Sequence, residues 1–261
     1  MQPHNDQALF DWIRSGREQL GNRRTPDWAG NLVSHLVPPL FEAYAKILHR
    51  VEAHYENIDS PLSQAEISIL GIPPCEPLKS FIEGRRANLL GNRVKWKELA
   101  ELLHVPFAPE ICHEWYRKKL VDTWCWPHLL SGPGDGGLDA EACAELASML
   151  TSFTDGQECF FRFSDIPFIN SDKPKLFKGA LNEVCAFPEG RRFGFEYWWP
   201  PDRSWCVCSD YDLHFSVVGG PRRLMSALLA SSVIECIGVT PENRIDVFAP
   251  MPSNPASGSR G

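Results

Sequence analysis

The pattern of hydrophobic and polar positions is most regular over residues 205–217. Apolar side chains recur there at every second position, interrupted only by Ser209, and polar side chains fill the positions between them. A period of two is typical of β structure with one buried face. The pattern therefore predicts a β element whose opposite face carries Cys206, Cys208, Asp210, Asp212, His214 and Ser216.

Other segments repeat apolar residues with helical spacing, most clearly over 96–103 and after Asp139, which can cap a helix. Residues 43–51 fit both a helix and a strand, and we favour a strand. Further short strands are expected near 157–163, 176–178 and 234–239. Helices and strands do not alternate regularly, so the sequence predicts an α+β fold with a mostly antiparallel sheet packed against several helices.

Proline, glycine and charged residues indicate how the chain is divided. We expect one α+β domain, interrupted by a loop-rich insertion and by a glycine-rich break that begins Ser-Gly-Pro-Gly. The final residues are rich in proline, serine and glycine, which is typical of a disordered tail. The expected parts are an N-terminal helix and loop at 1–30, the domain at 31–248, the insertion at 55–93, the break at 131–137 and the tail at 249–261.

Composition narrows the possible partners and the cellular location. The 261 residues include 26 lysines and arginines against 33 aspartates and glutamates, a formal charge of −7, so nucleic acid is not an expected partner. We expect no membrane segment, no cofactor and a cytoplasmic location. The nine cysteines are odd in number and scattered, which favours reduced, mostly buried thiols without a structural disulfide.

Asp210, Asp212 and His214 are the first candidates for chemistry, as a divalent-cation site or a general acid/base pair. In one straight strand Cys206 and His214 would lie about 26 Å apart at roughly 3.3 Å per residue, too far to share a metal. A turn around Ser209 would instead bring a cysteine opposite His214. The alternative interpretation is a solvated strand face, or a turn held by aspartate side chains.

An aromatic and charged cluster precedes this element. Trp198 and Trp199 either pack over the sheet or form a recognition surface, since tryptophan is common in binding hot spots. Asp202 and Arg203 follow, and they either pair with each other or hold a carboxylate or phosphate. We treat these four residues as the candidate partner-binding site.

Two weaker patterns suggest ligands. Cys112, His113, Cys125 and His128 are four possible zinc ligands, although adjacent Cys112 and His113 point apart in regular structure and apolar neighbours favour a buried thiol at Cys125. Gly219 and Gly220 lead into a helix that starts near Arg222 and Arg223. Free backbone amides and two cations there could bind an anion, whereas the alternative is a plain strand-to-helix turn with exposed arginines.

Two motifs resemble an uncharacterised family of bacterial proteins. The first is Val37-Pro38 followed by Phe41-Glu42-Ala43-Tyr44-Ala45-Lys46-Ile47-Leu48-His49, and the second runs from Trp198-Trp199-Pro200-Pro201-Asp202-Arg203-Ser204-Trp205-Cys206-Val207 to Asp212-Leu213 and Val218-Gly219-Gly220. The resemblance spans about residues 33–240. The family has no established activity, so it implies no catalytic residue.

The leading hypothesis from the sequence is a noncatalytic protein-binding module of the immunity or regulatory type. It rests on the aromatic cluster, the acidic charge and the lack of a complete catalytic set, and the acidic charge suits a basic partner protein. The alternative is a small metal-dependent hydrolase that uses Asp210, Asp212 and His214.

Overall fold

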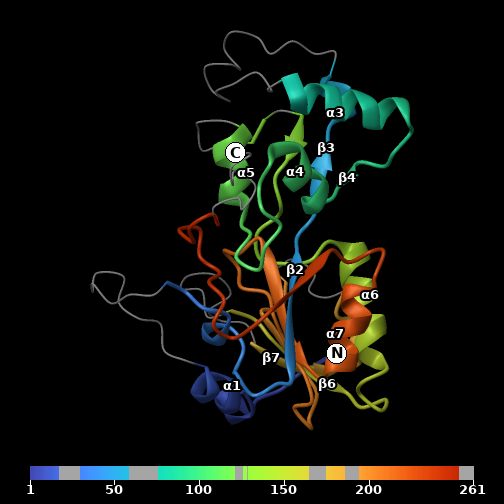
Figure 1. Ribbon diagram of the computed structural model, residues 1–261. Coiled ribbons are helices and arrows are strands. Elements are labelled where there is room, and N and C mark those ends of the chain that lie inside the picture. The colour runs from blue at the N-terminus through green and yellow to red at the C-terminus, as the bar shows by residue number, and fades with distance from the viewer. Residues whose placement is uncertain are drawn as a thin grey trace. The chain divides into compact units, whose positions relative to one another are not determined.

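The chain forms two compact units in the computed structural model, which describes residues 1–17, 30–58, 76–120, 126–127, 129–164, 175–185 and 194–252 (Figure 1). Unit 1 comprises Met1–His49 and Gly134–Arg244, and unit 2 comprises Arg50–Pro133 and Ile245–Gly261. The division differs from the single domain with a 55–93 insertion that the sequence suggested. All of Arg50–Pro133 belongs to unit 2. The chain returns to unit 1 at Gly134, which lies within the glycine-rich break at 131–137.

Unit 1 is built on an eight-stranded sheet in the order β1-β7-β6-β8-β9-β10-β2-β11. Each neighbouring pair is antiparallel, which confirms the expected α+β class with a mostly antiparallel sheet. The strands are β1 (Gln2–Pro3), β2 (Ala43–Leu48), β6 (Cys159–Arg162), β7 (Leu176–Gly179), β8 (Tyr197–Trp199), β9 (Cys206–Cys208), β10 (Phe215–Gly220) and β11 (Cys236–Val239).

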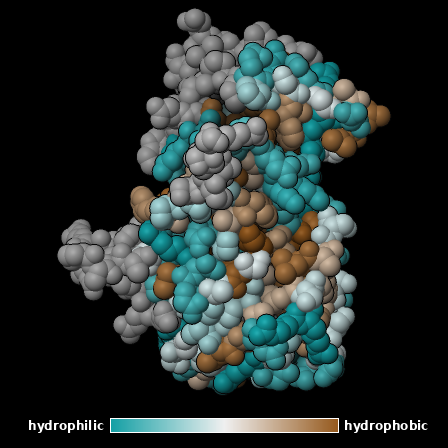
Figure 2. All heavy atoms as spheres, viewed as in Figure 1, coloured by the Kyte–Doolittle hydropathy of each residue, from teal (hydrophilic) through white to brown (hydrophobic). Residues whose placement is uncertain are grey.

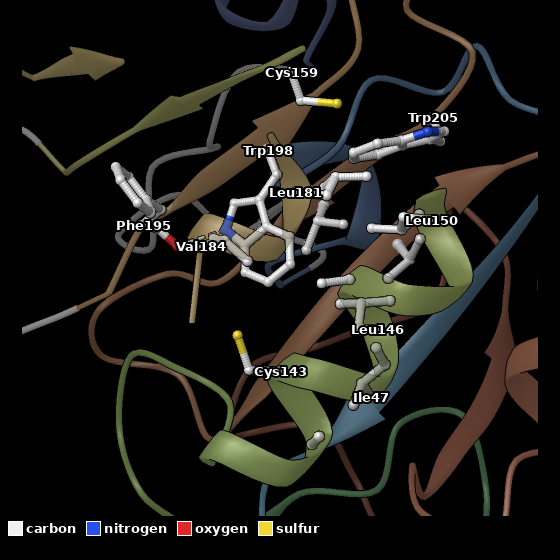
Figure 3. Packing of buried hydrophobic residues seen from close by; sticks show 14 of the residues in the cluster. Ile47, Cys143, Leu146, Leu150, Cys159, Leu181, Val184, Phe195, Trp198 and Trp205 are labelled. Carbon is white, nitrogen blue, oxygen red and sulfur yellow. Dashed lines mark hydrogen bonds between the residues drawn. The ribbon is translucent and has the colours of Figure 1, made fainter. Parts of the chain in front are cut away.

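Two helices, α6 (Ala140–Thr151) and α7 (Arg222–Leu229), cover one face of this sheet. Asp139 caps α6 as expected, because its carboxylate accepts the backbone N–H groups of Glu141 and Ala142 at 3.1 Å. Figure 3 shows the apolar stripe of α6 facing the strands, with Trp198 among its neighbours. Labelled members of this core include Ile47, Leu146, Leu150, Leu181, Phe195, Trp198 and Trp205.

The N-terminal segment covers the other face of the sheet. The 3₁₀ turn η1 (Gln7–Phe10) leads into α1 (Asp11–Gly16), and the Phe10 ring lies 5.0 Å from that of Tyr197 and 5.9 Å from that of Trp199. Because β1 also pairs with β7, the described part of the expected separate segment 1–30 belongs to unit 1. The sheet is therefore covered on both faces, which explains why Lys46, on the same face as Tyr197, is inaccessible.

The described residues of unit 2 form a three-stranded antiparallel sheet in the order β4-β3-β5 and the helices α3, α4 and α5. The Trp96 carbonyl accepts the Tyr116 hydroxyl at 2.9 Å, and the two rings pack edge to face at 5.2 Å. This packing places the helix expected at 96–103 in unit 2. The elements are β3 (Val51–Ala53), β4 (Arg93–Val94), β5 (Leu130–Ser131), α3 (Glu76–Ala87), α4 (Trp96–Leu103) and α5 (His113–Leu120).

The C-terminal segment is ordered further than the composition suggested. Ala249 is buried, and its carbonyl accepts the Trp115 indole N–H at 2.9 Å within unit 2. The expectation of a disordered tail from 249 is therefore wrong at Ala249, and residues 253–261 lie outside the described part of the chain.

Surface hydropathy alone does not identify a site. On the face that Figure 2 shows, hydrophobic patches lie scattered between hydrophilic ones, as on most protein surfaces. In the part of the chain that the structure describes, no helix is long and apolar enough to cross a membrane.

Candidate functional site

A surface groove of about 340 Å³ in unit 1 brings together four separate segments of the chain. They are α1, the loop before β2, the turn after β8 and the junction between β10 and α7. We call it the Trp12 groove. It is lined by Trp12, Leu40, Phe41, Glu42, Arg203, Ser204, Gly220 and Pro221.

The loop before β2 forms a fixed wall of the Trp12 groove. The Tyr44 hydroxyl donates to the Pro38 carbonyl and accepts the Phe41 backbone N–H, both at 2.9 Å. Burial raises the pKa of Tyr44, so the hydroxyl keeps the proton that it donates. Leu40 projects from this loop with 70% of its surface exposed. An exposed leucine on a hydrogen-bonded loop is a preformed apolar contact.

Gly219 allows this loop to lie against β10. A Cβ atom at Gly219 would lie 2.5 Å from Cδ2 of Phe41 and 2.9 Å from Cε1 of Tyr44, closer than carbon atoms approach one another. The sequence suggested that the glycine pair belongs to an anion-binding turn. Its role in the structure is close packing beneath the groove.

The anion site expected at Arg222 and Arg223 is already used by the protein itself. The carboxylate of Glu42 accepts the Arg222 backbone N–H at 3.1 Å, where an anion would bind the start of α7. The guanidinium of Arg223 lies 4.9 Å from the centre of the Phe153 ring. The geometry therefore agrees with a capped strand-to-helix turn and not with a vacant anion site.

Arg203 closes the Trp12 groove from the turn after β8. Its φ of 60° places it in the left-handed region, which costs a residue other than glycine about 1–2 kcal/mol. The turn is held by Asp202, whose carboxylate accepts the Ser204 backbone N–H at 3.0 Å. The Arg203 guanidinium lies 5.4 Å from the Trp12 ring centre. The turn thus positions a cation over an aromatic wall.

Two hydrogen-bond donors of the Trp12 groove find no acceptor within the described part of the chain. The indole nitrogen Nε1 of Trp12 and the hydroxyl Oγ of Ser204 are both buried, and neither makes a hydrogen bond with any described residue. A buried donor without an acceptor costs about 1–3 kcal/mol. Such groups are rare in folded proteins and indicate a place where a ligand could supply acceptors.

Trp198 and Trp199 lie inside unit 1 and not on its surface. Their exposed fractions are 4% and 1%. The Trp198 indole N–H donates to the Phe195 carbonyl at 3.3 Å, and the Trp199 ring stacks on Phe160 at 5.7 Å. Of the four residues expected to bind a partner, only Asp202 and Arg203 are exposed. The tryptophans fit the packing alternative.

The segment 205–217 is a hairpin and not one strand. Cys208 pairs with Val217 and Val207 pairs with Val218. Even-numbered residues of β9 therefore lie opposite odd-numbered residues of β10. Val207 therefore shares its sheet face with Val218, and Cys208 shares the other face with Val217. The expectation of one polar face was wrong because the alternation continues across a turn that reverses which face each set occupies.

The candidate acid/base residues lie in or beside that turn. Burial raises the pKa of Asp210 to about 8, and a hydrogen bond from its side chain to that of Asp212 and the charge of Glu196 add to this effect. His214 instead lies with its Nδ1 2.9 Å from the Asp135 carboxylate. The three candidates are thus divided between two pairs. No group of three or more histidine, cysteine or acidic side chains among the described residues could hold a metal ion.

The zinc candidates are only partly within the described structure. Cys112 is buried, and His113 lies with Nε2 3.7 Å from a Glu114 carboxylate oxygen. Cys125 and His128 lie outside the described residues. The zinc site therefore stays a prediction.

A buried histidine–serine network was not recognised from the sequence. His49 Nδ1–H donates to the Gly134 carbonyl at 2.8 Å, and its Nε2 accepts the Ser216 hydroxyl at 3.0 Å. Ser209 lies 2.6 Å from Ser216 Oγ. Burial lowers the pKa of His49 to about 4, so the ring is neutral at pH 7. Ser216 is fully buried, so the network fixes the end of β2 and does not present a nucleophile.

The cysteines also differ from the expectation. Cys143 in α6 and Cys185 form a disulfide, so the prediction that no disulfide exists was wrong. Scattered positions gave no signal for it, because the two cysteines are 42 positions apart in the sequence and only the fold brings them together. Burial raises the pKa of the Cys159 and Cys236 thiols to about 12 and that of Cys208 well above its usual range. These thiols are therefore unreactive at neutral pH.

Comparisons with known proteins add no functional label. No protein-family model matches this chain, and neither the curated proteins nor the solved structures provide a match. Functional inference therefore rests on the geometry of unit 1.

Proposed function

We propose that this protein is a noncatalytic protein-binding module that receives a segment of its partner in the Trp12 groove. The observation that carries the proposal is a pair of buried donors, Trp12 Nε1 and Ser204 Oγ, that find no acceptor among the described residues and lie beside the exposed side chain of Leu40. The proposal includes the cytoplasmic immunity or regulatory role that the sequence suggests.

The groove favours a partner residue that combines an apolar side chain with a carboxylate. Leu40 and Phe41 offer apolar contact, while the Arg203 guanidinium and the two donors offer only positive charge or protons. A carboxylate can accept several such hydrogen bonds at once. Glu42 also lines the groove and keeps its negative charge, but its carboxylate is held at the start of α7 by the Arg222 backbone N–H. Local donors therefore select the group that binds, although the protein as a whole is acidic.

The test uses N-acetyl-leucine as a probe that carries both groups. We expect the Trp12 indole N–H signal in a nitrogen-15-edited NMR spectrum to shift on titration, because the probe supplies its missing acceptor. Arg203→Ala should weaken probe binding about tenfold, the loss of roughly one charge-assisted hydrogen bond. Arg223→Ala is the matched control, since Arg223 packs on Phe153 and does not line the groove.

N-acetyl-leucinamide separates the carboxylate from the apolar contact. The amide retains the leucine side chain but lacks the negative charge, so it should bind more weakly than the acid. Equal binding of both probes, or shifts that spare the Trp12 indole, would refute the proposal.

The hydrolase is the second proposal that the sequence raises. It would require Asp210, Asp212 and His214 to act on one metal ion, whereas His214 pairs with Asp135. Metal analysis of the purified protein and of an Asp210→Ala/Asp212→Ala variant distinguishes the two proposals. We expect equal metal content in both, and metal lost only from the variant would support the hydrolase.

A further inference from the structure

The Cys143–Cys185 disulfide joins a buried sulfur to an exposed residue. Cys143 lies in α6 with 8% of its surface exposed and belongs to the core, and Figure 3 shows its sulfur pointing away from the helix. Cys185 follows the 3₁₀ turn η4 (Leu181–Glu183) and is exposed. The two Cα atoms are 5.9 Å apart, within the usual range for a disulfide. An external thiol can therefore approach this bond from the Cys185 side.

A cavity of about 350 Å³ lies beside Cys185. We call it the Cys185 cavity. Small side chains of α6 form one wall and leave room for a ligand, while hydroxyl and amide groups supply polar contacts. Its described lining consists of Ala144, Ala147, Ser148, Thr151, Asn182 and Cys185. Cavities that hold small molecules typically start at about 300 Å³, so a short peptide thiol can enter.

Other described thiols do not share this setting. Cys112, Cys159, Cys206 and Cys208 are buried, and burial raises the pKa of the half-buried Cys236 to about 12. Thiol chemistry among the described cysteines is therefore concentrated at the disulfide. Leu181 and Val184 are themselves buried against the core, so η4 stays anchored when the disulfide opens.

We propose that Cys185 is a site of thiol–disulfide exchange with a low-molecular-weight peptide thiol, which binds in the Cys185 cavity. The thiolate of the ligand attacks Cys185 Sγ, the Cys143–Cys185 bond breaks, and the leaving Cys143 sulfur takes a proton from solvent. The product is a mixed disulfide on Cys185 and a free Cys143 thiol. A second ligand thiolate then attacks the ligand sulfur of the mixed disulfide, which releases Cys185 as a thiolate and yields the oxidised ligand dimer.

Such an exchange explains how a disulfide is compatible with a reducing compartment. Disulfides of cytosolic proteins are mostly transient and redox-sensing, whereas structural ones belong to oxidising compartments. An exposed disulfide cysteine that lines a ligand cavity is the arrangement that exchange requires, since access of the attacking thiolate limits its rate. Whether Cys185 is in the disulfide, in the mixed disulfide or reduced then depends on the ratio of reduced to oxidised thiol in the surroundings.

The test starts from the fully oxidised chain and reduced glutathione as the probe. Samples are alkylated at intervals, and peptide mass spectrometry locates the modified cysteine. We expect glutathione on Cys185 and an alkylated Cys143, while circular dichroism shows the fold intact. Glutathione on Cys143, or no reaction at Cys185 in the folded protein, would overturn the proposal.

Single-cysteine variants separate the two sulfurs. In Cys143→Ser, the Cys185 thiol should react with oxidised glutathione at least about tenfold faster than Cys143 does in Cys185→Ser, because only Cys185 is accessible. Equal rates in two folded variants would contradict the assigned site.

A cavity variant retains the disulfide and tests ligand binding directly. Ala144 is exposed on α6, so Ala144→Phe should fill the cavity without disturbing the core. It should slow exchange with glutathione but not with the much smaller 2-mercaptoethanol. Ala140→Phe is the matched control on the same helix, because Ala140 is exposed outside the cavity lining. If Ala144→Phe slows both thiols equally, or neither, the cavity plays no part in the exchange.

Discussion

His49 makes the stability of unit 1 depend on pH in a way that can be calculated. Its folded pKa is lowered from 6.5 to about 4 because the ring is buried between Gly134 and Ser216. Between these two values the unfolded chain binds a proton at His49 that the folded chain does not bind. Stability therefore falls as the pH decreases from 6.5 to 4 and gains nothing further from His49 above that window.

The size of the effect follows from the pKa difference. A difference of 2.5, at about 1.36 kcal/mol for each pKa unit, gives about 3 kcal/mol of unfolding free energy. Replacement of the imidazole in His49→Gln removes the titrating group. We expect the stability difference between the wild type and this variant to grow by about 3 kcal/mol from pH 4 to pH 6.5.

Asp210 must be separated from His49 in this experiment. Its folded pKa is raised to about 8, so the folded chain binds a proton there that the unfolded chain releases above pH 4. The two residues therefore act in opposite directions between pH 4 and 6.5, and the wild type alone would show little net change. The comparison of wild type with His49→Gln is repeated in an Asp210→Asn background, where the aspartate contribution is absent.

Urea unfolding across this pH range provides the measurement. The indole NMR signals of Trp198 and Trp205, both buried in unit 1, report the unfolding of that unit separately from unit 2. A direct titration of the His49 ring in the folded protein provides a second readout. A His49 pKa near 6.5, or a stability difference that does not change with pH, would refute the reasoning.

Three further predictions concern stability. Gly219→Ala should lower the unfolding free energy, measured in urea, by about 1–3 kcal/mol, since the new methyl group meets Phe41 and Tyr44. Gly238→Ala is the control and should change the unfolding free energy little, because nothing lies within 4 Å of its Cβ position. Removal of the disulfide in Cys143→Ser/Cys185→Ser should lower the unfolding free energy by about 4 kcal/mol, because the two cysteines are 42 positions apart. The reduced wild type should be as stable as this variant. An unchanged unfolding midpoint would show that the bond does not restrain the unfolded chain. Asp210→Asn should become more stable than the wild type as pH rises from 4 to 8, because the folded aspartate must otherwise lose its raised-pKa proton; parallel stability–pH curves for the two proteins would contradict the burial of this carboxyl group.

Local patterns predicted the elements that depend on neighbouring residues. The helix at Trp96–Leu103 follows from periodicity, and the Asp139 cap follows from one side chain and adjacent amides. The strand at Ala43–Leu48 was favoured over a helix that the same pattern also fitted. The α+β class follows from the mixture of these elements. Each of these features is determined by residues within a few positions of one another, so one sequence suffices to predict it.

Features that join distant segments could not be predicted in this way. The Trp12 groove combines residue 12 with residues 40–42, 203–204 and 220–221, and no local pattern relates them. The His49–Ser216 contact likewise exists only because β2 pairs with β10. The sequence did not reveal that the polar residues of β9 and β10 lie on opposite faces of the sheet, because the residues in the turn continue the alternation of apolar and polar side chains. Tertiary pairing, and not local propensity, determines each of these sites.

The pairing of β2 also has a consequence for synthesis of the protein on the ribosome. β2 lies between β10 and β11, so Leu48 waits for its partner Phe215, which is 167 positions later (215 minus 48). At roughly 5–20 residues per second, this strand stays without its sheet partners for about 10–30 s after it is made. Its apolar residues are exposed during that time, whereas β3 meets β4 and β5 much sooner. Nascent unit 1 is therefore the part of this chain that most needs protection by a chaperone.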